Sequence, residues 1–253
     1  MILFANAKIN LGLSVFDRRD DGYHNIVSTF LPVPIHDIIE ILPAKEFNFH
    51  NTGIAINPTE NLIIKAFNLL KERCNIPNVY MHLHKCIPLG AGLGGGSSDA
   101  AFTLKGLNDL FKLNISQQLL MDLALELGSD CPFFIFNSPA NIRGRGEIIQ
   151  STRGFEGNYC KVVFPDIHIS TEDAFKNLIR HDNSHAFDLE FQNDFENWAF
   201  QQYPEIEKLK EKLYQEGAFV ANMTGSGSAV FGIYKEKPQK TTGFEFERIF
   251  RLE

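Results

Sequence analysis

Hydrophobic and polar residues alternate along the first part of the chain, and this pattern predicts strands. From residue 5 to residue 15 the apolar side chains share one face of an extended segment, and the other face carries Asn6, Lys8 and Asn10. A turn signal at residues 20–22 (Asp-Asp-Gly) separates this segment from a second extended run at residues 23–31. The two runs predict a hairpin, and strand-like sequence continues through residues 35–41.

Farther along, apolar residues recur with the spacing of amphipathic helices. Residues 61–73 predict a helix capped by Thr59, and residues 117–127 predict another that begins after Ser116 and ends at Gly128. We also expect helices at 172–179 and 205–216, and strands at 79–87, 131–136, 159–164, 219–223 and 228–234. This mixture of hairpins and helices predicts an α+β fold in two layers. Glycines thin the pattern between residues 144 and 157, so we expect a boundary near residue 155, between domains at 1–155 and 156–253.

The segment between the strand at 79–87 and the helix that follows is rich in glycine. Five of the seven residues from 90 to 96 are glycine, so the backbone can approach a ligand with no Cβ in the way. The first amides of the following helix lack intrahelical partners and carry the positive end of its dipole, so they suit a phosphate. Hydroxyls at positions 97 and 98 lie beside these amides. We interpret the segment as a cradle for nucleotide phosphates, formed by Pro88, Leu89, Gly90, Ala91, Gly92, Leu93, Gly94, Gly95, Gly96, Ser97 and Ser98.

Two other phosphate motifs fit this segment poorly. Gly90, Gly92 and Gly95 satisfy the dinucleotide fingerprint, which also needs an acidic residue about 20 positions later at a strand end. Asp109 comes too early for that role and lies inside a helical pattern. A Walker A loop needs a lysine after its last glycine, where this chain has Ser97. A flexible linker would not be flanked so closely by a strand and a helix.

The composition narrows the class of protein. A net charge of −7 and a pI near 5.6 argue against a nucleic-acid-binding protein, which usually presents a basic surface. No apolar run reaches the length of a transmembrane helix, and the first residues lack the pattern of a secretory signal. The four cysteines are scattered, as expected of reduced thiols. We therefore expect a cytoplasmic protein that binds neither nucleic acid nor a membrane.

Two charged residues are candidates for chemistry. Lys8 and Asn10 share a polar strand face, which fits either a solvated edge strand or a rigidly held cation that stabilises a moving phosphoryl group. Asp130 follows the end of a predicted helix, where the dipole favours cations, so a purely structural role suits this carboxylate less well. A neighbouring lysine would keep Asp130 ionised and able to accept a proton from a hydroxyl group. Phosphoryl transfer needs little more than such positioning and charge neutralisation.

Two further segments each allow two interpretations. Tyr23 and His24 form either an ordinary cross-strand pair or a platform for a planar base, which Phe175 would complete. Residues 224–228 (Thr-Gly-Ser-Gly-Ser) predict a hairpin turn, which would also bring amides and hydroxyls near a phosphate.

A possible metal cluster follows one strand. His82, His84 and Cys86 alternate along the strand at 79–87 and could in principle ligate zinc. No second cluster matches them, so we prefer a half-buried strand face and assign no metal ligands.

Taken together, the motifs resemble those of the GHMP small-molecule kinases. Residues 88–98 match the phosphate loop that these kinases share, and residues 128–134 and 223–228 match further family motifs. Ala-Lys-Ile-Asn-Leu at 7–11 and Arg-Arg-Asp-Asp-Gly-Tyr-His at 18–24 resemble the branch that phosphorylates a cytidine diphosphate-linked polyol for non-mevalonate isoprenoid synthesis. The departures are modest: Cys131 stands where valine is more usual, and the tail after Tyr234 carries no family signature.

The resemblance implies a fold, a reaction and a set of residues. The fold would combine an N-terminal ribosomal-S5-like domain, which has a left-handed crossover, with a C-terminal ferredoxin-like domain. With Mg²⁺ present, ATP would donate its γ-phosphate to the 2-hydroxyl of the methylerythritol part of the substrate. Asp130 would be the base and Lys8 would hold it ionised. The substrate would contact Asn10, Tyr23, His24, Thr171 and Phe175.

The resemblance also leaves two alternative functions to consider. A homoserine-type or mevalonate-type GHMP kinase would share the phosphate loop, although the residues at 20–24 argue against it. A catalytically silent nucleotide-binding homologue would keep the fold, although such a protein needs neither Lys8 nor Asp130. We expect a monomer or a weak homodimer.

Overall fold

The structure is a computed structural model of the whole chain, and it describes residues 1–57, 61–178, 191–241 and 243–253. These residues cluster into two units, each made of segments that lie far apart in the sequence. Unit 1 comprises Met1–Ala7, Pro34–Pro88 and Gly94–Ser138, and unit 2 comprises Lys8–Val33, Leu89–Leu93 and Pro139–Glu253. The boundary near residue 155 stays a prediction.

The predicted hairpin is present, and its strands are longer than expected. Strands β1 (Ile2–Arg18) and β2 (His24–Pro43) pair with each other, and both supply residues to the two units. At the turn, the Gly22 amide donates to the Arg19 carbonyl oxygen at 3.0 Å, and Gly22 has a φ of 85°. The second strand absorbs the segment at 35–41 because residues 31–41 continue to alternate between buried and partly exposed positions.

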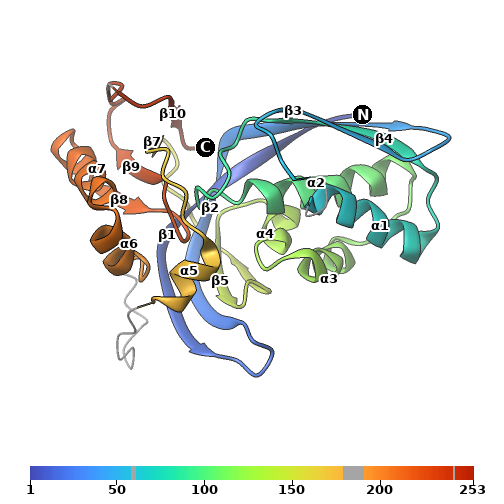
Figure 1. Cartoon of the computed structure of the whole chain (residues 1–253), viewed down its shortest axis with the longest axis horizontal. Helices are drawn as coiled ribbons and strands as arrows, with labels where there is room; N and C mark the ends of the chain where they lie inside the picture. Colours follow the sequence, from blue (N-terminus) through green and yellow to red (C-terminus); the bar gives the residue numbers. More distant parts are fainter. Residues whose placement is uncertain (58–60, 179–190, 242) are drawn as a thin grey trace. The chain divides into compact units, whose positions relative to one another are not determined.

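Unit 1 is a sheet with helices on one face. Strand β3 (Asn48–Gly53) pairs in parallel with β4 (Val79–Lys85), and β4 pairs antiparallel with residues 38–43 of β2. The parallel pair is joined through α1 (Leu62–Cys74), as a parallel connection requires, and the hand of this crossover stays a prediction. On the same side of the sheet follow α2 (Gly95–Leu110), α3 (Gln117–Leu127) and α4 (Cys131–Phe136) (Figure 1).

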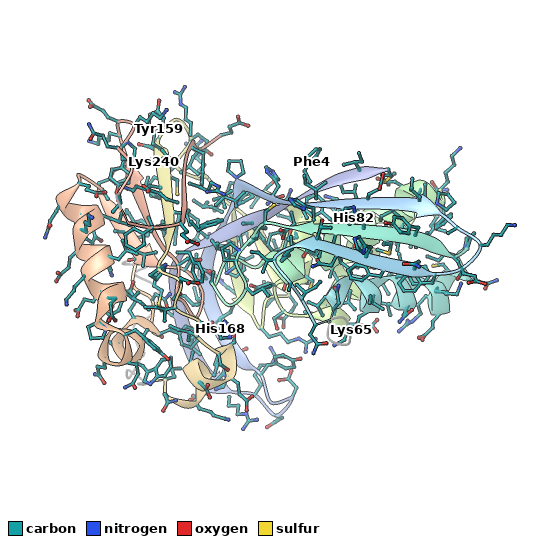
Figure 2. All side chains as sticks on the ribbon, turned by 45° about the horizontal axis from the view of Figure 1, so that its top comes forward. Phe4, Lys65, His82, Tyr159, His168 and Lys240 are labelled. Atoms are coloured by element: carbon teal, nitrogen blue, oxygen red, sulfur yellow. The ribbon has the colours of Figure 1, made fainter. Side chains whose placement is uncertain are left out.

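The two faces of β4 differ, as the alternation predicted. Val79, Met81 and Leu83 are buried toward the helices. The opposite face carries His82, labelled in Figure 2, and His84, and the Thr52 hydroxyl bonds to both imidazoles, at 2.8 and 2.9 Å. The preferred interpretation as a half-buried strand face is therefore confirmed. Within the described ranges, no group of three or more His, Cys, Asp or Glu side chains is arranged to hold a metal ion.

Unit 2 contains a four-stranded antiparallel sheet. Its strands stand in the order β10 (Phe246–Arg251), β7 (Tyr159–Phe164), β9 (Val230–Tyr234) and β8 (Val220–Met223). Counted along the chain this order is fourth, first, third, second, which is the predicted ferredoxin-like arrangement. Its helices are α5 (Thr171–Lys176), α6 (Glu196–Gln202) and α7 (Pro204–Gln215), and the expected end of the first of these at Ile179 lies outside the described residues. Strands β5 (Ala140–Gly144) and β6 (Ile148–Ser151) extend the pairing of residues 26–30 of β2.

The tail after Tyr234, to which the sequence assigned no role, completes this sheet. Strand β10 pairs antiparallel with β7 from Phe246 opposite Phe164 to Arg251 opposite Tyr159. The tail therefore supplies an edge strand and is part of the folded unit.

One predicted strand is a helix. Residues 131–136 form α4, and Pro132 lies in its first turn, where a missing N–H costs nothing. Asn137 ends the helix in the left-handed conformation, with a φ of 53°. The prediction was wrong because an unbroken run of six apolar residues has no periodicity that separates a strand from a short helix.

Two capping predictions have different outcomes. Ser116 caps α3 by accepting a hydrogen bond from the Leu119 amide, as expected. Asn61 caps α1 by accepting from the Ile63 amide at 2.9 Å, and the predicted cap, Thr59, lies outside the described residues. Among the helices of the described chain, none is long and apolar enough to span a membrane.

Candidate functional site

The glycine-rich segment lies between β4 and α2, as predicted, and its path depends on glycine. Gly90, Gly92 and Gly94 have φ angles of 63°, 72° and 71°, in the left-handed region that other residues avoid. A Cβ on Gly90 would lie 2.2 Å from Nδ1 of His168, a residue of the same unit that is labelled in Figure 2. The residues present therefore fit a backbone cradle that side chains would fill.

Helix α2 begins with uncapped amides. Its N-cap is Gly94, which offers no side chain to bond them. The two hydroxyls beside these amides do not cap them: Ser97 bonds to the thiol group of Cys131, and the buried hydroxyl of Ser98 has no hydrogen-bond partner among the described residues. The first turn of α2 thus keeps the donors and the dipole that suit an anion.

Lys8 holds residues 92–93 of the glycine segment, which belong to unit 2 as Lys8 does. Its backbone amide donates to the Leu93 carbonyl oxygen at 3.0 Å, and its ammonium donates to the Gly92 carbonyl oxygen at 2.8 Å. The ammonium also donates to Asn10 Oδ1 and lies 5.0 Å from the ring centroid of Phe30. Lys8 is 2% exposed and Asn10 is 1% exposed, which excludes a solvated edge strand and leaves a rigidly held cation.

The turn at residues 224–228 packs on the same segment. The hydroxyl of Thr224 donates to Asn10 Oδ1 at 3.0 Å and also approaches the Gly92 carbonyl oxygen at 3.2 Å. The Ala229 amide donates to the Ala91 carbonyl oxygen at 3.2 Å. The predicted hairpin between β8 and β9 is confirmed, and its first residue is a structural partner of Asn10 and the glycine segment.

Asn193 supports this turn, although no sequence pattern marks it. Its buried amide nitrogen donates to the carbonyl oxygens of Met223 and Gly225, both at 2.8 Å, and its Oδ1 accepts from the Phe195 amide at 3.0 Å. The asparagine stands in a loop, where periodicity carries no information, and its two carbonyl partners are about 30 residues away.

We expect Asn193→Ala to lower the free energy of unfolding by about 2–3 kcal/mol, because it leaves three buried backbone groups without a partner. The turn at 224–228 should lose its fixed position, so ATP affinity should fall as well. Chemical denaturation and calorimetric ATP titration measure the two effects. Asn177→Ala, at the exposed end of α5, is a matched control, and equal stability of both variants would contradict this role of Asn193.

Asp130 stands in unit 1 at the N-terminus of α4, and this corrects the electrostatic argument made from the sequence. It is the N-cap residue, so the nearest helix dipole favours its negative charge. The next residue, Cys131, is buried and hydrogen-bonded to Ser97 in the first turn of α2. Burial raises the pKa of Cys131 to about 12, so this thiol stays protonated. Within unit 1, Asp130 therefore adjoins a residue that contacts the end of the glycine segment.

Unit 2 also contains a pocket of about 530 Å³. It brings together three predicted substrate residues, because Tyr23 and His24 follow the β1–β2 turn and Phe175 lies on α5. The rings of His24 and Phe175 stack with centroids 5.0 Å apart and an angle of 22° between planes. Tyr23 is 46% exposed, so its ring is accessible. The rest of the lining is Arg18, Gly22, Glu172 and Lys176.

The other two predicted substrate residues do not line this pocket. Asn10 belongs to the buried network of Lys8 and Thr224. The hydroxyl of Thr171 lies 3.2 Å from that of Ser226, although the next residue, Glu172, is part of the lining.

Charged residues stiffen the turn beside the pocket. Arg19 bonds to Asp21 at 3.1 Å and to Glu147 at 3.2 Å. The Arg145 guanidinium lies 4.5 Å from the ring centroid of Tyr23. Sequence reasoning missed Arg145 and Glu147 because their partners lie more than 120 residues earlier in the chain. It also missed the lining residues Glu172 and Lys176, which pair with each other at 2.7 Å on α5.

Comparisons with known proteins agree with the motifs. The profile for the GHMP kinases N terminal domain matches residues 61–138, and the profile for the GHMP kinases C terminal domain matches residues 174–242. A 4-diphosphocytidyl-2-C-methyl-D-erythritol kinase from Cytophaga hutchinsonii is 45% identical, over 94% of each chain. A crystal structure of 4-(cytidine 5'-diphospho)-2C-methyl-D-erythritol kinase has 34% identity and a TM-score of 0.77, and covers 92% of this chain and 90% of its own.

A more distant structure shares the fold alone. The mevalonate kinase of Methanococcus jannaschii has a TM-score of 0.69 over 100% of this chain and 98% of its own, at 14% identity. At 14% identity the mevalonate kinase shows only that the fold is shared, whereas identities of 45% and 34% to the two cytidylylated-polyol kinases show a closer relationship. The chain belongs to the GHMP kinases and, within them, to the 4-diphosphocytidyl-2-C-methyl-D-erythritol kinases.

Proposed function

We propose that the protein transfers the γ-phosphate of ATP to the 2-hydroxyl of 4-diphosphocytidyl-2-C-methyl-D-erythritol. The hydroxyl oxygen forms a bond to the γ-phosphorus, the bond from that phosphorus to the β,γ-bridging oxygen breaks, and ADP leaves. The hydroxyl proton passes to a carboxylate. The observation that carries the proposal is the buried Lys8 ammonium bonded to the Gly92 carbonyl oxygen, which fixes a cation at a glycine segment suited to phosphates.

On the ATP side, the backbone supplies the binding groups. The glycines at 90, 92 and 94 turn the chain with positive φ, and α2 begins directly after them with uncapped amides. Mg²⁺ would arrive with ATP and would neutralise charge on the phosphates. Residues 88–98 are accordingly the proposed ATP-binding segment.

The proposed catalytic residues are Lys8 and Asp130. Phosphoryl transfer depends on positioning and charge stabilisation, with a carboxylate that orients and deprotonates the nucleophile. Asp130 offers that carboxylate at the start of α4, and Lys8 offers a cation whose position is fixed by two hydrogen bonds. The cation would stabilise charge on the transferred group.

The pocket lined by Tyr23, His24 and Phe175 is proposed to hold the cytosine end of the substrate. Stacked aromatic rings suit a planar base, and the lining adds the positive charge of Arg18, which suits a diphosphate, whereas Lys176 is paired with Glu172. Asn10 and Thr171 act indirectly in this proposal. Asn10 holds Lys8, and Thr171 joins α5 to the turn at 224–228.

The reaction is tested by product analysis. Purified protein with Mg-ATP and the cytidylylated polyol should yield equal amounts of ADP and one new phosphomonoester, followed by phosphorus NMR. When homoserine or mevalonate replaces the cytidylylated polyol, no phosphorylated product should form. Release of inorganic phosphate alone would contradict the proposal, and phosphorylation of homoserine would favour the homoserine-type alternative.

His24→Ala should raise the KM for the cytidylylated polyol by about 10-fold or more, because stacking on a base contributes about 1–3 kcal/mol. The KM for ATP should stay within a factor of two of the wild type. Steady-state ADP release at varied concentrations of each substrate measures both constants. His84→Ala, on the exposed face of β4, is the matched control and should change neither. A rise in the KM for ATP alone would refute the assignment of the pocket.

A further inference from the structure

Three charged side chains are buried together in unit 1 beneath the start of α2. Lys85 ends β4, Asp37 lies on β2, and Asp99 lies in the second turn of α2, and they are 2%, 0% and 3% exposed. The Lys85 ammonium donates to Oδ2 of Asp37 and to Oδ2 of Asp99, the latter at 2.7 Å. The reaction proposed above gives none of these residues a role.

The network joins the two ends of the glycine segment. Oδ1 of Asp37 accepts from the amides of Cys86 and Ile87, at 2.6 and 2.8 Å, which are the last residues before Pro88. Through Lys85 the same carboxylate is linked to Asp99, directly after the segment. A Cβ on Gly95 would lie 2.9 Å from the Lys85 ammonium, so the lysine lies directly under the first residue of α2.

The network does not act by supplying positive charge. Two carboxylates face one ammonium, so the net charge of the three groups together is zero when one aspartate is protonated and negative when both are ionised. Burial, with the nearby Asp37 as a smaller contribution, raises the pKa of Asp99 to about 7 against the opposing effect of Lys85. For Lys85, burial lowers the pKa, but the two aspartates outweigh it and the net pKa is raised, so the ammonium stays charged.

Stability alone does not explain such a network either. Buried ion pairs are often no more stabilising than apolar side chains of the same volume, because desolvation offsets the attraction. One oxygen of Asp99, Oδ1, has no hydrogen-bond partner among the described residues, which adds to the cost. Hydrogen bonds and ion pairs are directional, so they fix the position of a functional segment more specifically than apolar packing would.

We propose that Lys85, Asp37 and Asp99 are positioning residues that hold the two ends of the glycine segment in the geometry required to bind the phosphates of ATP. The inference rests on the proposed function, since it takes ATP as the ligand of that segment. The three residues do not touch the nucleotide. They act through the backbone of residues 86–87 and the first turns of α2.

Asp99→Ala tests the link to α2 most cleanly. It leaves the Lys85–Asp37 contact and the bonds from Asp37 to the backbone intact, and it places alanine in a helix that continues with Ala100 and Ala101. We expect the Kd for ATP to rise about 10-fold, because small misplacements of binding groups are costly. The melting temperature and the KM for the polyol should stay near wild-type values. Asp99→Asn keeps an oxygen that accepts from Lys85 and should restore most of the affinity.

Lys161 provides the matched control for the loss of a buried lysine. It lies in unit 2, is 0% exposed, and faces two carboxylates, Glu216 at 2.6 Å and Glu247 at 3.3 Å. Lys85→Met should lower both the melting temperature and ATP affinity, whereas Lys161→Met should lower the melting temperature alone. Equal loss of ATP affinity in both would overturn the proposal, as would wild-type affinity in Asp99→Ala. Failure of the wild type to bind ATP would instead refute the proposed function.

The pH dependence of stability provides a second readout. The folded-state pKa of Asp99 lies above its ordinary value of 3.8, so between about pH 4 and pH 7 the native state holds a proton that the unfolded chain releases. Wild-type stability should therefore fall relative to Asp99→Asn as the pH rises through this window. The groups that face Asp99 are Lys85 from β4 and Asp37 from β2. Denaturant titrations at pH 5 and pH 7.5 measure the difference, and an unchanged difference would contradict the placement of Asp99 in the network.

Discussion

Replacing Asp130 with asparagine is expected to lower the turnover number by about 10²-fold or more, because general-base catalysis contributes 10²–10⁴-fold and a carboxamide accepts no proton. Asparagine has nearly the size and shape of aspartate, and its amide oxygen can still accept a hydrogen bond. The fold and the affinity for ATP should therefore be preserved. Stopped assays of ADP formation with Mg-ATP and the polyol measure turnover, and calorimetry measures ATP binding.

Asp122→Asn is the control for this substitution. Asp122 lies on α3, in the same unit, and its side chain accepts a hydrogen bond from Gln118 at the surface. Its removal should leave turnover unchanged. A fully active Asp130→Asn variant would show that another group accepts the proton, and loss of ATP binding in that variant would place Asp130 with the nucleotide instead.

Gly92→Ala is expected to weaken ATP binding by about 10²-fold, because displacing binding groups by roughly 1 Å has effects of this size. The new Cβ would lie 1.9 Å from the carbonyl oxygen of Thr224, and the φ of 72° is unfavourable for alanine. Either the glycine segment or the turn at 224–228 must move. ATP titration followed by calorimetry measures the effect.

Gly217→Ala is the control for Gly92→Ala: it introduces the same kind of backbone strain without the steric clash. Gly217 has a φ of 96°, and no atom of the described residues lies within 4 Å of the position that a Cβ would take. The substitution therefore introduces strain of about 1–2 kcal/mol without a clash. We expect reduced stability with unchanged ATP affinity in this variant. Wild-type affinity in Gly92→Ala would contradict the cradle.

Local patterns predicted the parts of the site that are continuous in sequence. The glycine segment was recognisable because strand, glycines and helix follow one another within about 30 residues, and each has its own signal. The β1–β2 hairpin was recognisable from the Asp-Asp-Gly turn. The alternation around Lys8 and Asn10 showed their shared face but left open whether it was solvated, since burial depends on residues such as Thr224 more than 200 positions later.

The remaining features depend on partners that local sequence does not specify. Asn193 and Asp37 act through backbone groups about 30 and 50 residues away, so their role exists only in the folded chain. Strand β10 is stabilised by pairing with β7, and its own sequence carries no strong strand signal. The expectation of a monomer or weak homodimer stays a prediction.

The most direct test of the central claim, that glycine backbone binds the phosphates, is NMR of protein labelled with ¹⁵N at glycine. Titration with a nonhydrolysable ATP analogue and Mg²⁺ should shift the amide signals of the glycines in residues 90–96 saturably, while those of Gly217 and Gly243 stay in place. Saturable shifts elsewhere, with the glycine signals of residues 90–96 unmoved, would contradict the claim.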